Sequence, residues 1–311
     1  MLNGLNEAGL TMWQINNITT FIHKHKGLLG VLPALLFVIF FFIGGFIHSF
    51  RISLGDYEEI YGAGEAGWAY KELFDISFFE SLGVTVGIAG AVSLLAGMIG
   101  LFIALLLASY TYNRTWSHLI FQLPFGVPHL LAAYMLTQTF MQTGWYSRIA
   151  YHLGWIDSFE AFPVLIHDQW GIGVILAYSW KEIPFIVLLL YPFVIKLFLE
   201  WKDTVKMLGA NQSQMIRWVF IPILLPIWVG GMWVVFSFVL GSYEIPALMA
   251  KTSFGFIPVL AWQEYTQFGL SRQPLAMAMN IVLALVALLI GIVLLICQRK
   301  WLASGRSVWK G

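Results

Sequence analysis

Six long apolar stretches divide the chain, and they constrain its fold more than any other feature. They cover roughly residues 27–50, 82–109, 119–141, 171–195, 221–243 and 275–297. A helix needs about 20 apolar residues to cross the hydrocarbon core of a bilayer, whereas a membrane β-strand shows alternation over about 10 residues. Because helices satisfy their own backbone hydrogen bonds in lipid, we predict an all-α polytopic membrane helix bundle of about six transmembrane helices.

The amino-acid composition excludes an ordinary water-soluble domain. Hydrophobic residues make up 59% of the chain and charged residues 11%, and the mean hydropathy is +0.78. The first apolar stretch is longer than that of a cleaved signal peptide and no small-residue cleavage site follows it, so we predict an uncleaved anchor. The single cysteine, Cys297, excludes an intramolecular disulfide and a cysteine-based metal site.

Lysine and arginine residues are concentrated on one side of the predicted bundle. That side carries Lys24, Lys26, Arg114, Lys196, Lys202, Lys206, Arg217, Arg299, Lys300, Arg306 and Lys310, and the other carries Arg51, Lys71, Arg148, Lys251 and Arg272. Basic residues favour the cytoplasmic side, which predicts cytoplasmic termini and a cytoplasmic 196–220 loop. Most acidic residues fall on the opposite side, which is either a solvated outer surface or a docking face for an external solute-binding protein.

Glycine and proline positions suggest how the helices pack. Gly83 and Gly87 have small-xxx-small spacing in the second stretch, which predicts close approach of a neighbouring helix. Prolines in the third, fourth and fifth stretches predict kinks or interruptions, at Pro124, Pro128, Pro184, Pro192, Pro222 and Pro226. Tryptophan and tyrosine residues in the segment 142–170 predict a short interfacial helix.

The loop between the fourth and fifth stretches is charged and amphipathic. Val205 with Leu208, and Met215 with Val219, fall at helical spacing and predict two short amphipathic helices. A break between these helices is expected around Gly209. Such a pair either offers an apolar ridge to a protein partner or lies flat on the lipid surface.

The same loop resembles the coupling loop of ATP-binding-cassette (ABC) importer permeases. The family pattern is E-A-A, three residues, Gly, nine residues and I-x-L-P. Asp203-Thr204-Val205 stand at the first triplet, Gly209 follows after three residues, and Val219-Phe220-Ile221-Pro222 begins after nine more. Three further segments match the family in order: Ser81–Thr85, Leu123–Pro128 and Trp180–Phe185. The chain therefore resembles the membrane-spanning subunit of a type I ABC importer, with a MetI-like permease architecture.

This resemblance implies a domain organisation and a function. Residues 1–26 would form a cytoplasmic tail, 27–77 the first transmembrane helix and outer loop, 78–298 the permease domain with coupling loop 196–222, and 299–311 a second cytoplasmic tail. The chain would form the solute pathway in a bacterial inner membrane by alternating access. The ATPase contacts would come from Asp203, Thr204, Val205, Leu208, Gly209, Ala210 and Pro222.

The resemblance also implies partners and cofactors. A cytoplasmic ABC ATPase dimer, a second permease subunit (a related chain or a second copy) and an external solute-binding protein would complete the importer, surrounded by membrane lipid. No G-x-x-x-x-G-K-[ST] loop occurs, so ATP and Mg²⁺ would bind the partner ATPase and no cofactor this chain. Neither an enzymatic activity nor a nucleic-acid partner is expected.

Polar residues within apolar stretches are costly in a membrane and are therefore candidates for the solute pathway. Lys181 and Glu182 interrupt the fourth stretch. The segment Gly241–Pro246 resembles G-x-[FY]-E-[VI]-P in permeases for polyamines, thiamine and ferric iron, which implies that Glu244 meets a cation. Further candidates are Trp180, Tyr243 and Asn280. Structural pairing at a helix contact is the alternative for each.

Two other functions stay open from the sequence. A secondary transporter driven by an ion gradient would use Glu182 as its coupling carboxylate, and a non-transporting membrane scaffold would need no ATPase. The sequence contains no H-E-x-x-H metal motif and no G-x-S-x-G nucleophile motif. It does not fix the substrate, although the Glu244 segment favours a small cationic or organic solute.

Overall fold

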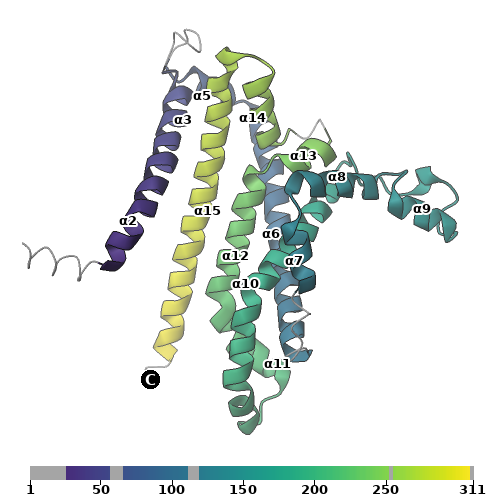
Figure 1. The fold of residues 1–311 in the computed structure, drawn as a ribbon, viewed down its shortest axis with the longest axis vertical. Coiled ribbons are helices and arrows are strands. Elements are labelled where there is room, and N and C mark those ends of the chain that lie inside the picture. The colour runs from purple at the N-terminus through teal and green to yellow at the C-terminus, as the bar shows by residue number, and fades with distance from the viewer. Residues whose placement is uncertain (1–25, 57–65, 111–118, 252–254, 309–311) are drawn as a thin grey trace, which may run out of the picture.

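The fold is an all-helical bundle with a projecting arm (Figure 1). The computed structural model describes residues 26–56, 66–110, 119–251 and 255–308, and no strand occurs among them. Five helical segments are long and apolar enough to cross a membrane: Gly30–Leu54, Ile76–Ser109, Ile172–Met207, Gln212–Gly241 and Leu270–Trp301. The predicted all-α membrane bundle is confirmed. The predicted N-terminal tail before Lys26 lies outside the described residues, as does Arg114.

Three long helices form the centre of the bundle: α6 (Ile76–Tyr110), α10 (Ile172–Met207) and α12 (Ile221–Gly241). Each packs against the other two. Polar groups connect α6 to α12, because Ser93 Oγ donates to the carbonyl of Met232 at 2.7 Å and Trp228 Nε1 donates to the carbonyl of Gly97 at 2.8 Å. These bonds satisfy polar groups that have no water partner inside lipid.

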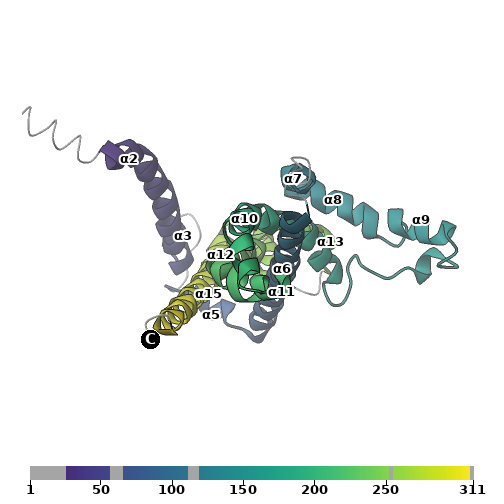
Figure 2. The same cartoon turned by 90° about the horizontal axis from the view of Figure 1, so that it is seen from below.

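Two further long segments flank this centre. The helix α15 (Gln273–Val308) packs against α12 and extends through the first ten residues of the predicted C-terminal tail. The first segment consists of α2 (Lys26–Val38), a π-helical stretch (Ile39–Ile43) and α3 (Gly44–Leu54). Its α3 part lies against α15, whereas α2 diverges from the bundle (Figures 1 and 2). Large apolar side chains of this segment, such as Phe40 and Phe42, are exposed in the chain by itself, as expected for a surface that faces lipid.

Short helices close one end of the bundle. They are α5 (Trp68–Leu73), α13 (Glu244–Met249), α14 (Ile257–Thr266) and a 3₁₀ turn, Leu270–Arg272. Arg272 joins two of them, because its guanidinium lies 2.6 Å from a Glu72 oxygen and 2.9 Å from a Glu264 oxygen.

The third apolar stretch differs from its prediction. Instead of one span over 119–141, the chain forms α7 (Leu119–Gly126) and α8 (His129–Phe140), with Pro128 in an extended conformation (φ −56°, ψ 142°) between them. Pro128 has no N–H to donate and disfavours a helical conformation at the residue before it. The expected sixth membrane-length span is therefore absent among the described residues, whereas the interruption predicted at Pro128 is present.

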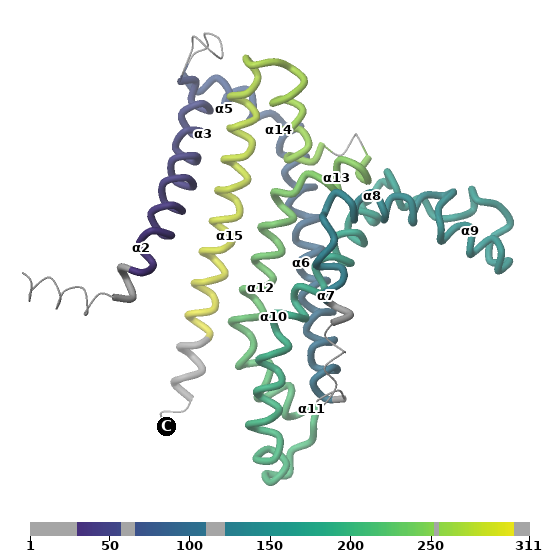
Figure 3. Tube along the Cα trace, in the orientation of Figure 1, coloured from purple at the N-terminus to yellow at the C-terminus, as the bar shows by residue number. Residues whose placement is uncertain are grey.

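The second part of this stretch leads away from the bundle. The helix α8 continues into α9 (Trp145–His152), and both project sideways from the long helices (Figures 1 and 3). A 3₁₀ turn, Phe159–Ala161, follows on the way back to α10. The predicted interfacial helix corresponds to α9, which buries Ser147 and Ala150 and exposes Trp145.

The predictions made for the other prolines and for the glycines were only partly correct. The helix α10 is unbroken through Pro184 and Pro192, so no interruption occurs there. A Cβ atom at Gly83 or Gly87 would meet nothing within 4 Å, so the predicted close approach at this pair is wrong within the chain. The close approach occurs further along α6, at Gly100, where a Cβ would lie 2.6 Å from Ile186 of α10.

We predict that Gly100→Ala lowers the melting temperature of the purified chain. The added methyl group displaces Ile186 in the α6–α10 contact, and overpacking of this kind costs about 1–3 kcal/mol. Intrinsic tryptophan fluorescence during heating in detergent measures the change. Gly87→Ala is the matched control on the same helix and leaves the melting temperature unchanged or slightly higher, because its methyl group enters open space. Equal melting temperatures for the two variants would contradict the packing described for α6 and α10.

Candidate functional site

The turn between α10 and α11 (Gln212–Met215) has a well-defined backbone geometry. Gly209 adopts a left-handed conformation with φ +76°. Its N–H donates to the carbonyl of Lys206 at 3.0 Å, and the N–H of Ala210 donates to the carbonyl of Val205 at 3.2 Å. This pair of bonds is a Schellman motif, in which glycine is favoured because it has no Cβ. The predicted break at Gly209 is present in the structure.

A second motif continues directly from this turn. Asn211 caps α11, since its side-chain oxygen accepts from the backbone N–H of Gln214 at 2.9 Å and its own N–H donates to the Gln214 side chain at 2.9 Å. This is a capping box, which satisfies two backbone donors at a helix start. Sequence reasoning missed the role of Gln214, although the N-x-x-Q spacing was a usable signal.

The predicted pair of short amphipathic helices takes a different form. Its first member is the end of α10, which belongs to the long apolar helix Ile172–Met207. Its second member is α11, which passes through a π-helical stretch, Ile216–Phe220, into α12. Phe198 and Phe220 meet edge to face at 4.8 Å between centroids and close the base of the hairpin. The turn is thus attached rigidly to two membrane-length helices.

The proposed ATPase-contacting residues divide into exposed and buried sets. Asp203, Thr204, Leu208 and Gly209 are exposed, whereas Val205 is buried and Ala210 and Pro222 are half-buried. Leu208 and the adjacent Met207 are 81% and 82% exposed, an unusual exposure for large apolar side chains at a loop tip. The exposed set shares one tip, which we name the coupling tip (residues 203–209).

A polar cluster lies further along α10, inside the apolar part of the bundle. Lys181 is buried, and its ammonium donates to the carbonyl of Pro124 at 2.9 Å and to that of Val127. These carbonyls lie at the end of α7 and just beyond it, where a helix leaves its last acceptors short of donors. The Pro124 carbonyl accepts one long backbone bond, from the N–H of Val127 at 3.4 Å. Lys181 therefore stabilises the break in the third apolar stretch.

Glu182 has a separate partner, as expected for neighbours about 100° apart on a helix. Its carboxylate lies 3.8 Å from Nε2 of His129, the first residue of α8. Sequence reasoning treated His129 as isolated, because its partner is 53 positions away and no local pattern links them.

A cavity of about 260 Å³ opens beside this pair. It is lined by Phe125, His129, Lys181, Glu182, Phe185, Val234, Val235 and Phe238. Most of this lining is apolar or aromatic, with a few polar groups contributed by α8 and α10, which is typical of small-molecule sites. We name it the mid-helix cavity.

The remaining sequence candidates lie outside the cavity lining. Glu244 begins α13, which packs against α8, and accepts a hydrogen bond from Ser242 Oγ at 3.1 Å. Tyr243 packs on Trp262 with 5.3 Å between ring centroids. Trp180 and Asn280 are exposed and are not brought to the cavity. No cluster of three His, Cys, Asp or Glu side chains suited to a metal occurs in the described part of the chain.

The chain is similar in sequence to known transport proteins over part of its length. The chain is 28% identical over 161 residues to the sulfate transport system permease protein CysT of Salmonella typhimurium, which covers 51% of this chain and 54% of that protein. The chain thus matches about half the length of this relative. No protein-family model matches the chain.

Solved structures extend the likeness to nearly the whole chain. The crystal structure of a bacterial ABC transporter that imports the acidic polysaccharide alginate matches with a TM-score of 0.69, covering 91% of this chain and 99% of the matched chain at 17% identity. The alginate transporter in complex with its periplasmic protein bound to an alginate pentasaccharide matches with a TM-score of 0.67, covering 88% and 94% at 17% identity. The fold is therefore that of an ABC-importer permease, and the long apolar helices indicate a multi-pass membrane protein.

We predict that Lys181→Met loosens the junction between α7 and α8. The variant removes the donor of the Val127 carbonyl, which costs about 1–3 kcal/mol for a buried group, and leaves the Pro124 carbonyl with only the long bond from the Val127 N–H at 3.4 Å. Hydrogen exchange of the amides at 129–133 should become about fivefold faster or more, the factor that corresponds to about 1 kcal/mol. Lys196→Met is the matched control on α10, because Lys196 is exposed and pairs only with Glu200 at 3.8 Å. Unchanged exchange in Lys181→Met would show that the ammonium does not hold this junction.

Proposed function

We propose that the chain is the membrane-spanning subunit of a type I ABC importer. It forms part of the solute pathway and couples that pathway to a separate cytoplasmic ATPase. The observation that carries this proposal is the rigid coupling tip, which presents Met207 and Leu208 to a partner at the end of two membrane-length helices. The permease fold and the spacing around Gly209 support it independently.

The geometry provides a mechanical link between the tip and the pathway. Glu182 and Leu208 belong to α10 and its cap, and 26 residues of helix separate them by roughly 39 Å at 1.5 Å per residue. Val234 and Phe238 of α12 line the opposite wall of the mid-helix cavity. Movement of the tip by an ATPase would therefore shift both walls of the cavity, which is the rigid-body motion that alternating access requires.

The proposed assembly contains several chains. Two ATPase subunits would bind and hydrolyse ATP with Mg²⁺ on the cytoplasmic side, next to the coupling tip. A second permease subunit, a related chain or another copy, would complete the pathway, and a solute-binding protein would deliver the substrate outside. The structure of the alginate ABC transporter in complex with a periplasmic protein bound to an alginate pentasaccharide supports this part of the proposal. The chain would lie in a bacterial inner membrane with both termini in the cytoplasm.

The substrate proposed here is a small cationic or organic solute, such as a polyamine, thiamine or an iron complex. Glu182 carries a carboxylate at the mid-helix cavity, and Glu244 begins α13, the helix that packs against α8 and so lies near His129. The single lysine of the cavity directs its ammonium to backbone carbonyls instead. Carboxylates beside aromatic rings suit a cation, whereas the solutes named for the relatives, sulfate and alginate, are anionic.

We predict that Gly209→Val removes the ATPase from the complex and Gly209→Asn retains it. Space around Gly209 is open, so the difference is one of backbone conformation. Valine disfavours the left-handed region by about 1–2 kcal/mol, whereas asparagine enters it readily. Quantitative mass spectrometry of proteins that co-elute with the tagged chain from native membranes measures the ATPase.

Two results would contradict the coupling proposal. The first is equal ATPase recovery with valine and asparagine at position 209. The second is elution of the well-folded unmodified chain without any P-loop ATPase, which would favour an ion-coupled carrier.

We predict that Glu182→Gln lowers the initial uptake rate of a cationic substrate by roughly tenfold, the factor that corresponds to 1.4 kcal/mol. Cells that lack the chromosomal copy and express each variant are tested with radiolabelled spermidine, thiamine and sulfate. The matched control is Glu200→Gln, since Glu200 is an exposed acid on the same helix. If Glu182→Gln impairs only sulfate uptake, the cationic substrate class is wrong while the importer proposal stands.

A further inference from the structure

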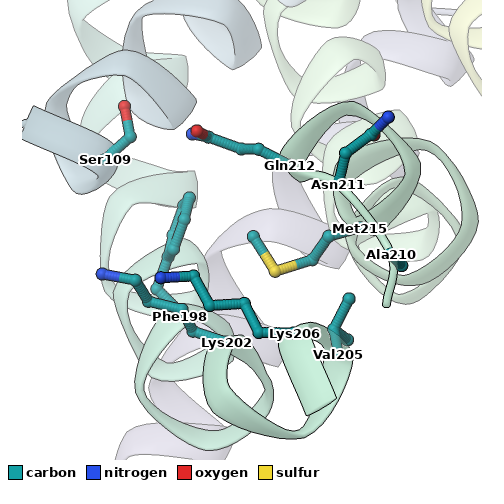
Figure 4. Close-up of a pocket in the computed structure, with 9 residues that line it drawn as sticks. All are labelled: Ser109, Phe198, Lys202, Val205, Lys206, Ala210, Asn211, Gln212 and Met215. Atoms are coloured by element: carbon teal, nitrogen blue, oxygen red, sulfur yellow. The ribbon is translucent and has the colours of Figure 1, made fainter. Parts of the chain in front are cut away.

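A recess of about 320 Å³ lies beside the coupling tip, between α6, α10 and α11 (Figure 4). Its lining consists of Ser109, Phe198, Lys202, Val205, Lys206, Ala210, Asn211, Gln212 and Met215. Figure 4 shows the ammonium groups of Lys202 and Lys206 reaching the recess from α10, and the amide end of Gln212 extending toward Ser109. The resemblance to importers assigns no role to these groups.

The charge of this recess is uncompensated within the described residues. Lys202 and Lys206 lie one helical turn apart, so both ammonium groups reach the same side of α10. No described acidic side chain lines the recess, and neither lysine forms an ion pair with a described residue. By contrast, Lys196 pairs with Glu200 further along the same helix. Two unpaired cations beside amide and hydroxyl groups are suited to bind an anion with oxygen acceptors.

The floor of the recess limits the choice of anion. Phe198, Val205 and Met215 are buried apolar side chains that line the recess beside the two lysines. A free inorganic anion gains nothing from an apolar floor, whereas a phospholipid places its phosphate on the cations and its glycerol and first methylenes against such a surface.

The position of the recess along the bundle favours the same ligand. Ser109 is the next-to-last residue of α6 (Ile76–Tyr110), and Lys196, Lys202, Lys206 and Arg217 gather at this end of the bundle. Such an excess of basic residues is expected on the cytoplasmic side, next to the lipid headgroups. Polybasic segments at this level attract anionic lipids.

We propose that this recess binds the phosphate of an anionic phospholipid headgroup through Lys202 and Lys206. The bound lipid would bridge the end of α6 to the base of the coupling tip and so resist separation of these elements. This inference does not depend on the proposed transport function, because it rests on the charges, the floor and the position of the recess.

The test is a lipid titration of the purified full chain in detergent. Native mass spectrometry counts bound dioleoyl phosphatidylglycerol, with dioleoyl phosphatidylcholine as the zwitterionic comparison. We expect the double variant Lys202→Gln/Lys206→Gln to bind the tightest phosphatidylglycerol roughly 30-fold more weakly, since each lysine near an anionic headgroup contributes about 1 kcal/mol. Lys196→Gln is the matched control and binds it like the unmodified chain. Melting temperatures verify that all variants fold.

Two further measurements separate the possible sources of the anion and locate the site. Inorganic phosphate at millimolar concentration should not displace the lipid, and displacement by it would overturn the lipid assignment in favour of a free phosphate. A photoactivatable phosphatidylglycerol should crosslink to peptides within 197–216 in the unmodified chain, and much less in the double variant. Equal lipid binding by the double variant, or crosslinks confined to other helices, would refute the site.

Discussion

A backbone carbonyl inside a bilayer has no water to bind, so it needs a donor from the protein. In this chain, one such donor determines how α7 and α8 are placed against α10. The helix α7 stops before Pro128, which leaves the Val127 carbonyl without a helical donor and the Pro124 carbonyl with only a long bond from the Val127 N–H at 3.4 Å. Lys181 supplies the missing donor from α10. The ammonium therefore fixes α7 against α10, and this contact places His129 at the start of α8 beside Glu182. The break, the buried lysine and the acid–imidazole pair form one connected arrangement.

The helix α10 connects this arrangement to both ends of the bundle. At its start, the Asp168 carboxylate accepts from the backbone N–H groups of Ile172 at 2.8 Å and Gly173 at 3.3 Å, which fixes where the helix begins. At its other end, the Schellman turn at Gly209 fixes where it stops. A helix that is defined at both ends and packed along its length transmits displacement instead of fraying. The mid-helix cavity and the coupling tip are thus positions on one rigid element.

The sequence predicted the long helices well and their interruptions less well. Apolar length alone located the five long segments, because spanning a bilayer imposes that length on any sequence. The same criterion failed at 119–141, where apolar residues continue through Pro128 although the backbone does not. Lys181 and Glu182 were recognised as costly residues in an apolar stretch, but their partners could not be identified, because Pro124, Val127 and His129 come from a distant segment. At Gly83 and Gly87 the sequence pattern predicted a helix contact that the structure lacks. The close contact on this helix is made at Gly100 instead.

The coupling segment shows why spacing was more informative than residue identity. The family triplet has Ala-Ala where this chain has Thr204-Val205, and the structure gives these two positions different requirements. Thr204 is exposed, so packing within the chain places little constraint on its side chain. Val205 is buried, and its carbonyl accepts the Schellman bond from Ala210, so an apolar side chain there packs where the turn closes. Valine meets that requirement as alanine does. The geometry of the turn depends on Gly209 and on the number of residues around it, and these are the features that the chain shares with the family pattern.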